Sequence, residues 1–242
     1  MKHYGIIGYP LQHSFSAQFF NKKFADEGIE AEYSLYPLDN IRDFPTLIST
    51  RRFSGMNVTM PYKQSVIPYI DSLDEGAQSV GAVNVIAFGA DGALRGYNTD
   101  VIGFRESICA LLRHDDRRAL ILGTGGAAKA AACGLHQLGI ESEYVSRDNS
   151  RGITYDCLTR DIVEKHSLIV NCTPLGMHPE TENKPDFPYN YLTSAHFLFD
   201  CIYNPEKTLF LLEGERRGCR TMNGTGMLYG QAKAAWRIWN KQ

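Results

Sequence analysis

A glycine-rich stretch in the second half of the chain has the residue types and spacing that hold a pyrophosphate. It reads, in order, Gly123, Thr124, Gly125, Gly126, Ala127 and Ala128. The apolar run RALIL precedes it and the helical pattern KAAACGLHQLG follows, which is the strand–turn–helix context of G-x-G-x-x-A. Gly123 permits a tight turn, and the backbone at Gly125 can approach a phosphate at a helix N-terminus. A strand–helix turn without a ligand is the alternative; the context favours a dinucleotide site.

The segment after the next apolar run determines which dinucleotide this would be. Arg147 and Arg151 offer guanidinium groups that can hold a ribose 2′-phosphate through charge-assisted hydrogen bonds. Asp148 lies about 20 residues past the loop, where an acidic side chain accepts from an unphosphorylated ribose. The two arginines favour NADP, NAD stays open, and plain surface charges are the remaining interpretation.

Short polar motifs in the first half suit a substrate with several hydroxyl groups. Ser14 and Ser16 begin a helical pattern, so one of them is expected to be its N-cap, yet both hydroxyls could face a polyol. Asn57 and Thr59 would share one face of an extended segment. Thr59 could equally cap the helix that Pro61 begins.

Three further residues have both a chemical and a structural interpretation. Lys63 could take part in catalysis or be a solvated lysine, and Asp100 could cap the helix that follows it. Asn84 lies in an otherwise apolar segment, where a buried amide needs a partner. These residues are far apart along the chain, and spacing does not show that they converge.

The composition excludes several functional classes. Of 242 residues, 43% are hydrophobic and 21% charged, which is typical of a globular protein with one or two domains. Lys and Arg total 25 against 27 Asp and Glu without a long basic run, which argues against nucleic acid or a membrane surface as partner. No apolar run reaches the roughly 18 residues of a membrane span. Six cysteines without a CxxC pair and seven histidines without ligand spacing predict reduced thiols, a cytoplasmic location and no metal.

Apolar runs alternate with helical patterns along the whole chain, which predicts an α/β fold. In the first half, strands are expected at YGIIGY, AEYSLYPL and GMNVTM, and a hairpin at VNVIAF and ALRGYN. The second half opens on the continuous apolar run RALILG, typical of a parallel strand that is covered on both faces. A helix predicted over 101–112 would carry the chain from one domain to the next.

Nine stretches, taken together and in this order, resemble the shikimate dehydrogenase family nearly from end to end of the chain. They are GYPLQHSFS, GMNVTMPYK, GAVNVIAF, GYNTDVIGF, LILGTGGAAKAA, Ser146-Arg147, NCTPLGMHP, FDCIYNPEKT and NGTGMLYGQAKAAW. The resemblance implies a two-domain protein: an N-terminal α/β substrate domain (1–101 and 225–242) and a C-terminal Rossmann dinucleotide-binding domain (102–224). The implied reaction is the reversible NAD(P)H-dependent reduction of 3-dehydroshikimate to shikimate in aromatic amino acid biosynthesis.

The resemblance also implies roles for individual residues. Lys63 and Asp100 would be the catalytic pair. The substrate would contact Ser14, Ser16, Asn57, Thr59, Asn84, Tyr203 and Gln231. The cofactor would contact Gly123, Thr124, Gly125, Gly126, Ala127, Ser146, Arg147, Arg151, Thr173, Cys201 and Gly224.

Two departures from the family pattern bear on specificity. Ser146 and Asp148 stand where the family usually has asparagine and threonine, and Asp148 keeps NAD open beside NADP.

A broader quinate/shikimate dehydrogenase is the alternative enzyme. A non-catalytic sensor on the same fold is disfavoured because Lys63 and Asp100 are both present. The sequence is compatible with a monomer or a homodimer.

Overall fold

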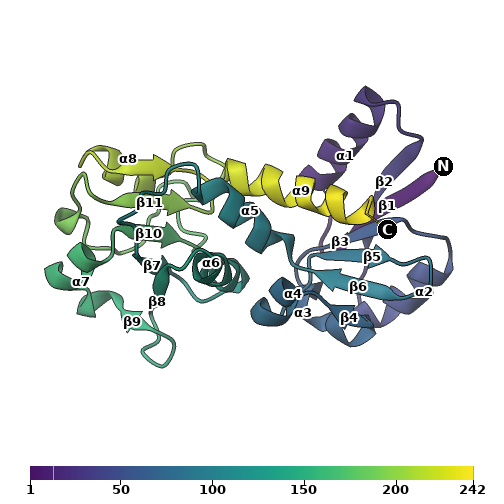
Figure 1. Cartoon of the computed structure of the whole chain (residues 1–242), viewed down its shortest axis with the longest axis horizontal. Coiled ribbons are helices and arrows are strands. Elements are labelled where there is room, and N and C mark those ends of the chain that lie inside the picture. Colours follow the sequence, from purple (N-terminus) through teal and green to yellow (C-terminus); the bar gives the residue numbers. More distant parts are fainter. Residues whose placement is uncertain (13, 242) are drawn as a thin grey trace. The chain divides into compact units, whose positions relative to one another are not determined.

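A computed structural model describes residues 1–12 and 14–241; His13 and Gln242 lie outside the described residues. The chain forms two compact units (Figure 1). The first comprises residues 1–99 together with the segment that begins at Ala232, and the second comprises residues 100–231. None of the described helices combines the length and the apolar character that crossing a membrane requires.

The first unit contains a mixed six-stranded sheet in the order β2-β1-β3-β5-β6-β4. Its strands are β1 (Lys2–Gly8), β2 (Ala31–Pro37), β3 (Gly55–Val58), β4 (Ser72–Leu73), β5 (Val85–Phe88) and β6 (Leu94–Tyr97). Strands β2, β1 and β3 are parallel, whereas β3, β5 and β6 are antiparallel. The predicted hairpin is confirmed, with Val85 opposite Tyr97.

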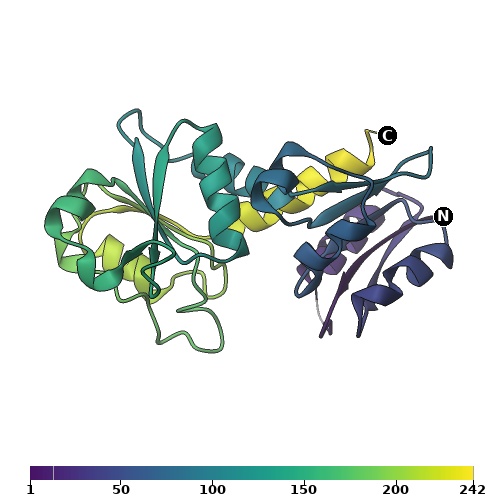
Figure 2. The same cartoon turned by 90° about the horizontal axis from the view of Figure 1, so that it is seen from below.

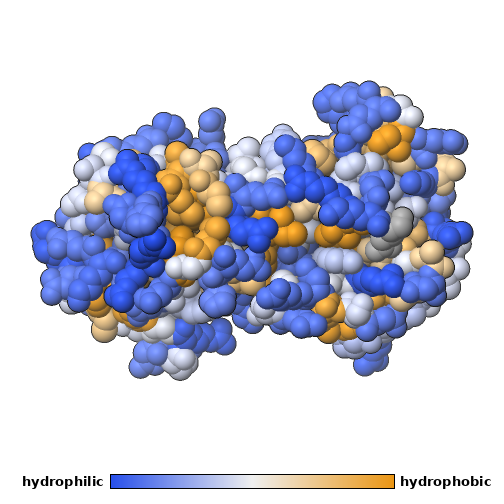
Figure 3. Space-filling model, viewed as in Figure 1, coloured by the Kyte–Doolittle hydropathy of each residue, from blue (hydrophilic) through white to orange (hydrophobic). Residues whose placement is uncertain are grey.

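Helices pack on both faces of this sheet. They are α1 (Phe15–Asp26), η1 (Ile41–Asp43), α2 (Phe44–Ser49), α3 (Tyr62–Ser65), η2 (Ile67–Tyr69) and α4 (Glu75–Val80). On one face, Phe20 and Phe24 of α1 pack with Tyr4 and with Trp239 from the end of the chain. The exposed residues of α1 include Lys22 and Asp26, and hydrophilic side chains make up most of the upper right of Figure 3, where Figure 1 places this helix.

The second unit contains six parallel strands in the order β9-β8-β7-β10-β11-β12. They are β7 (Arg118–Leu122), β8 (Glu141–Ser146), β9 (Ile153–Thr154), β10 (Leu168–Asn171), β11 (Phe197–Asp200) and β12 (Arg220–Met222). This is the strand order 3-2-1-4-5-6 of dinucleotide-binding folds, which reverses direction between β7 and β10. The predicted fold class, α/β with a second Rossmann unit, is confirmed.

Helices cover both faces of the parallel sheet (Figure 2). They are α5 (Thr99–Ile108), α6 (Gly126–Gln137), η3 (Tyr155–Cys157), α7 (Arg160–Lys165), η4 (Tyr189–Tyr191), α8 (Leu209–Glu215) and the start of α9 (Thr225–Trp239). From Ala232 onward, α9 belongs to the first unit. Ile121 packs in the cluster that α6 joins, whereas Leu120 packs with residues of α7 and α8. Burial on both faces explains why RALIL is continuously apolar.

Helix α5 crosses α9 closely at a glycine. A Cβ atom at Gly103 would lie 2.5 Å from the carbonyl oxygen of Met227, so only glycine fits this crossing. Helix α5 ends at Ile108, earlier than the predicted residue 112. The reason lies just beyond it: the Leu111 carbonyl accepts a hydrogen bond from Arg220, and the Arg113 N–H donates to Asp116. These side-chain bonds replace the hydrogen bonds of a further helical turn.

Candidate active site

The glycine loop and Thr173 meet at the point where the strand order of the second unit reverses. Gly123 follows β7 with φ at 105°, a left-handed conformation that favours glycine. A Cβ atom at Gly123 would lie 3.3 Å from the methyl group of Thr173, which follows β10. The carboxyl ends of β7 and β10 therefore form the crevice in which such folds bind ligands.

Open space adjoins the start of α6. Cβ atoms built on Gly125 and Gly126 would meet no atom within 4 Å, and both residues are exposed. Gly125 is the N-cap of α6, so the N–H groups of the first helical turn are available to an anion. The loop therefore fits the pyrophosphate of a dinucleotide. The predicted residues Thr124 and Ala127 lie in the loop and in the first turn of α6.

The segment after β8 holds an ordered carboxylate. Asp148 Oδ1 accepts hydrogen bonds from the Ser150 N–H at 3.0 Å and the Ser150 hydroxyl at 2.8 Å. These bonds, assisted by the Arg151 guanidinium 3.6 Å away, hold the pKa of Asp148 below its ordinary value. Ser146 is buried and accepts from the Asp148 N–H, while Arg147 is exposed. Arg151 is thus already paired with Asp148, so a ribose 2′-phosphate would share the guanidinium with this carboxylate.

A buried polar network supports Thr173. Asn171 Oδ1 accepts from the Thr173 N–H at 3.0 Å and from its hydroxyl at 2.7 Å. The Asn171 amide in turn donates to Asp200 Oδ1 at 3.0 Å. Asn171 and Asp200 are both fully buried. The network fixes the backbone and hydroxyl of Thr173 at the edge of the crevice.

Cys201 and Gly224 follow the next two strands at the same edge. The sulfur atoms of Cys201 and Cys172 are 3.5 Å apart, and both residues are free thiols. The Gly224 N–H donates to the carbonyl of Ile202 at 2.9 Å. The structure therefore brings the predicted residues Gly123, Thr173, Cys201 and Gly224 to one edge of the parallel sheet. Their contact with a cofactor stays a prediction.

The sequence interpretation did not include Asp200 in this site. Its position directly after the apolar run FLF, at the end of a parallel strand, is the signal that could have identified it. Burial raises its pKa to about 6, although hydrogen bonds from Thr208, the Ile202 N–H and Asn171 offset part of the rise.

Replacing Asp200 with asparagine should remove a pH-dependent component of stability. With a pKa of about 6 in the folded state and about 3.9 when unfolded, the folded chain binds more protons between these values. The free energy of unfolding therefore falls as pH rises through this window. Relative to the wild type, the free energy of unfolding of the variant should rise by about 2 kcal/mol between pH 4 and pH 7, measured by urea unfolding followed by circular dichroism. The exposed Asp161→Asn is the control, and a stability difference that is constant with pH contradicts the assignment.

In the first unit, Tyr33 joins two of the predicted substrate residues. The Tyr33 hydroxyl donates to Asn57 Oδ1 at 2.6 Å, and the Asn57 amide donates to the Asn84 carbonyl at 3.1 Å. Burial raises the pKa of Tyr33 well above its ordinary value, and the nearby Ser16 hydroxyl offsets part of this rise. Tyr33 thus connects α1, β2 and β3. The sequence interpretation overlooked it because a tyrosine in a strand is ordinary core material.

Ser14 and Thr59 adjoin α1 and β3, the elements that carry Ser16 and Asn57. Ser14 is the N-cap of α1, as one of the two serines was expected to be, but its hydroxyl makes no capping hydrogen bond. Thr59 follows β3, and its N–H donates to the Ile7 carbonyl at 2.9 Å. Pro61 is the N-cap of α3, and no side chain, Thr59 included, makes a capping bond there.

Backbone contacts hold Lys63 beside Asn84. The carbonyl of Lys63, in α3, accepts from the Val83 N–H at 2.7 Å. Asn84 is buried, and its side chain accepts from the Thr99 N–H at 2.8 Å and donates to the Thr99 hydroxyl at 3.1 Å. The amide therefore has the partner that its burial requires, and it anchors the start of α5.

Asp100, Tyr203 and Gln231 belong to the second unit. Asp100 lies in the first turn of α5, so it is not the cap of that helix. Tyr203 is exposed after β11, and the backbone of Gln231 packs near Gly103. Because Lys63 and Asp100 lie in different units, their pairing stays a prediction, as do the substrate contacts of Tyr203 and Gln231.

Comparison with known proteins identifies the family. Residues 6–86 match the family described as the shikimate dehydrogenase substrate binding domain. The chain is 36% identical to the shikimate dehydrogenase (NADP(+)) of Desulforamulus reducens, over 97% of this chain and 88% of that protein.

Solved structures agree with this match. The shikimate 5-dehydrogenase from Listeria monocytogenes, in complex with shikimate and NAD, superposes with a TM-score of 0.90 at 27% identity, covering 100% of this chain and 92% of that one. Quinate dehydrogenase from Corynebacterium glutamicum, in complex with NAD, superposes with a TM-score of 0.88 at 26% identity, covering 100% of this chain and 94% of that one. Since the sequence likeness extends over nearly the whole of both chains, this chain belongs to the shikimate dehydrogenase family.

Proposed function

We propose that this protein is an NADP-dependent oxidoreductase that reversibly reduces 3-dehydroshikimate to shikimate in aromatic amino acid biosynthesis. The observation that carries the proposal is the crevice of the second unit, where the glycine loop meets Thr173 at the reversal of strand order. The Desulforamulus reducens relative, which carries the name of an NADP(+) enzyme, supports the choice of cofactor.

The second unit offers the groups that a dinucleotide needs. The loop Gly123–Ala127 would hold the pyrophosphate, and Ser146, Arg147 and Arg151 would hold the adenosine ribose and its phosphate. Thr173, Cys201 and Gly224 would flank the nicotinamide. The bound cofactor supplies a hydride, and the protein's own residues provide the positioning and the proton.

The substrate domain, which we place at residues 1–101 and 225–242, contains the first unit and would bind the substrate. Serine, threonine and amide side chains suit a substrate with several hydroxyl groups because each offers both donors and acceptors or a rotatable hydroxyl. Ser14, Ser16, Asn57, Thr59 and Asn84 would provide these groups. Tyr33 orients two of them through its contacts with Ser16 and Asn57. Tyr203 and Gln231 would complete the contacts.

Lys63 would act on the carbonyl that is reduced. Negative charge develops on the carbonyl oxygen as the carbon is reduced, and an ammonium group both stabilises this charge and donates a proton to the oxygen. Asp100 would keep the lysine charged and oriented. In the reverse direction, Lys63 would accept the proton from the substrate hydroxyl.

The test is absorbance in the reduced-nicotinamide band with shikimate or quinate and NADP or NAD, in all four pairings. A signal strongest with shikimate and NADP is expected. A stronger signal with NAD would contradict the cofactor assignment, and no signal from folded protein in any pairing would contradict the enzymatic proposal.

Oxidation of quinate is the second candidate activity. The structural likeness to the quinate dehydrogenase from Corynebacterium glutamicum favours it. A rate with quinate that equals or exceeds the rate with shikimate in the same assay would establish this broader specificity.

Replacing Asp148 with threonine should raise the preference for NADP over NAD. The change removes a carboxylate that occupies Arg151 and would repel a 2′-phosphate. The ratio of kcat/KM for NADP to that for NAD should rise by about tenfold, which corresponds to about 1.4 kcal/mol. The exposed Asp115→Thr is the control. An unchanged ratio would mean that Asp148 does not face the cofactor.

We also propose a cytoplasmic location, which the six free thiols support because disulfides are rare in reducing compartments.

A further inference from the structure

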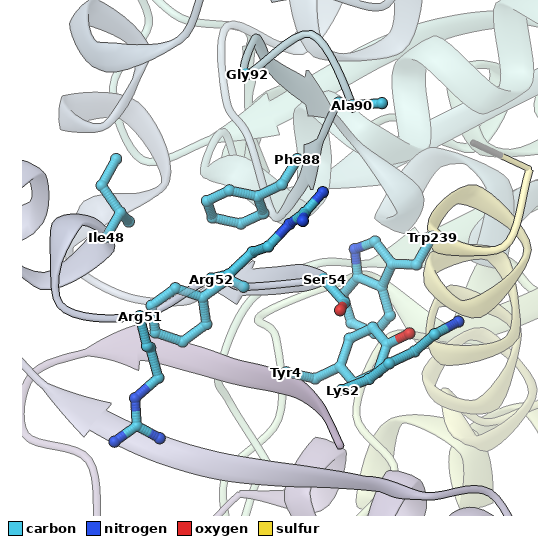
Figure 4. Close-up of a pocket in the computed structure, with 12 residues that line it drawn as sticks. Lys2, Tyr4, Ile48, Arg51, Arg52, Ser54, Phe88, Ala90, Gly92 and Trp239 are labelled. Carbon is cyan, nitrogen blue, oxygen red and sulfur yellow. The ribbon is translucent and has the colours of Figure 1, made fainter.

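A pocket of about 490 Å³ opens in the first unit, away from the proposed substrate residues. It lies at the amino ends of β1 and β3, where Lys2, Tyr4 and Ser54 line it (Figure 4). Thr59, by contrast, follows the carboxyl end of β3. Ser54 and Thr59 are separated along the strand by roughly 16 Å at about 3.3 Å per residue. The pocket and the proposed substrate site therefore occupy opposite edges of one sheet.

The charged side chains that line the pocket are all cationic. They are Lys2, Arg51 and Arg52. Arg51 points away from the other lining residues in Figure 4 and pairs with Glu32 at 3.2 Å. The side chains of Lys2 and Arg52 have no hydrogen-bond or ion-pair partner within the described part of the chain. Figure 4 shows Arg52 reaching between Phe88 and Trp239. The pocket thus presents two uncompensated positive charges.

The hydroxyl group of Tyr4 is buried in this pocket without a partner. Tyr4 is 0% exposed, and its oxygen makes no hydrogen bond within residues 1–12 and 14–241. Burial raises its pKa, and the nearby Ser54 hydroxyl offsets part of the rise, although the two groups do not meet hydrogen-bond geometry. Buried polar groups in native proteins nearly always have a partner, so the unpartnered hydroxyl indicates one that binds here.

The remaining walls are apolar. Phe53 and Phe88 form one side, and the Trp239 ring forms another, its N–H being already bonded to the Ile86 carbonyl at 3.0 Å. Phe53 and Trp239 are only 3% and 5% exposed, whereas Phe88 is partly exposed. A ring placed against Phe88 would cover its accessible face, which an inorganic anion would not do. A volume in the range of small-molecule sites is sufficient for one ring with a charged group.

We propose that this pocket binds a small carboxylate with an aromatic ring, whose carboxylate meets Lys2, Arg52 and the hydroxyls of Tyr4 and Ser54. The ring lies against Phe88 and Trp239. This site goes beyond the proposed oxidoreductase function, because none of its residues belongs to the substrate or cofactor groups.

Benzoate is the probe and neutral benzamide its matched comparison, each titrated by calorimetry into the full-length protein with shikimate at saturating concentration. Saturation with shikimate prevents benzoate from being counted at the substrate site. Benzoate should bind at least tenfold more tightly than benzamide and should alter the fluorescence of Trp239. Arg52→Gln should weaken benzoate binding by about tenfold, because a charge-assisted hydrogen bond is lost. Tyr4→Phe should weaken it by about fivefold without loss of folding.

Arg42→Gln, the same change at an exposed arginine of the first unit that does not line the pocket, is the control and should leave benzoate binding unchanged. Turnover with shikimate should be unaffected in Arg52→Gln, which separates this site from the proposed activity. Three results would overturn the proposal: no binding of benzoate, equal weakening by Arg42→Gln and Arg52→Gln, or inorganic phosphate binding as tightly as benzoate.

Discussion

Replacing Lys63 with alanine should lower kcat for shikimate oxidation by a factor of about 10²–10⁴, the usual contribution of a positioned proton-transfer group. The methyl side chain can neither accept the proton of the substrate hydroxyl nor stabilise charge on its oxygen. The dissociation constant for NADPH should stay within about twofold of the wild-type value, because Lys63 lies outside the unit that carries the glycine loop. Steady-state kinetics and a titration of NADPH fluorescence measure the two quantities.

Gln64→Ala is the matched control for this experiment. Gln64 is the next residue of α3 and is exposed, so its variant reports any general effect of shortening a side chain in this helix. It should retain wild-type kcat. Wild-type turnover in Lys63→Ala would contradict the catalytic role of the lysine, and a loss of NADPH binding would point to a structural role instead.

Replacing Asp116 with alanine should lower the free energy of unfolding by about 3–5 kcal/mol, because it leaves a largely buried guanidinium without its counter-ion. Asp116 Oδ2 and Oδ1 accept from Arg220 at 2.8 and 2.9 Å, and the Asp116 side chain is 1% exposed. Although burial raises it, the bonds from Arg220 and the Arg113 N–H hold the pKa of Asp116 below its ordinary value. Urea unfolding at pH 7, followed by circular dichroism, measures the loss.

The adjacent Asp115 provides the control, because it is exposed and Asp115→Ala should change the stability by less than about 0.5 kcal/mol. A second variant separates the loss of a bond from the cost of an unpaired charge. Asp116→Ala combined with Arg220→Met should be more stable than Asp116→Ala alone, since the buried charge is gone. A double variant as unstable as the sum of the two single ones would contradict this explanation.

Local patterns predicted the parts of the fold that depend on local chemistry. The glycine loop could be predicted because the tight turn after β7 requires glycine at position 123, and close packing of α6 on the sheet requires small residues. The turn residues predicted the β5–β6 hairpin. The continuous apolar run predicted that strand β7 is covered on both faces. Strands β4 and β9, with two residues each, were not, because a period cannot be read from so short a segment.

The side chains that organise the candidate site were harder to predict, because their partners are distant in the sequence. Tyr33 acquires its role from Asn57, 24 residues away, and Asp200 from Asn171, 29 residues away. The residues next to Tyr33 and Asp200 in the sequence indicate only that each of them belongs to a strand. The resemblance to a family is the source of the prediction for Lys63 and Asp100, whereas the buried residues Tyr33 and Asp200 become evident only in the folded structure.

The first unit is built from two segments that are separated in the sequence by the second unit, and this has a consequence for synthesis on the ribosome. The second unit is one continuous segment, but the aromatic core of the first unit is completed by Trp236 and Trp239 of the last helix. A Cβ atom at Gly55 would lie 2.4 Å from the Trp239 ring, so any larger residue at this position would collide with the tryptophan. Tyr4 and Phe20 of the first unit therefore lack part of their packing until α9 has been translated. The nascent chain should fold its second unit first and be most dependent on chaperones during that interval.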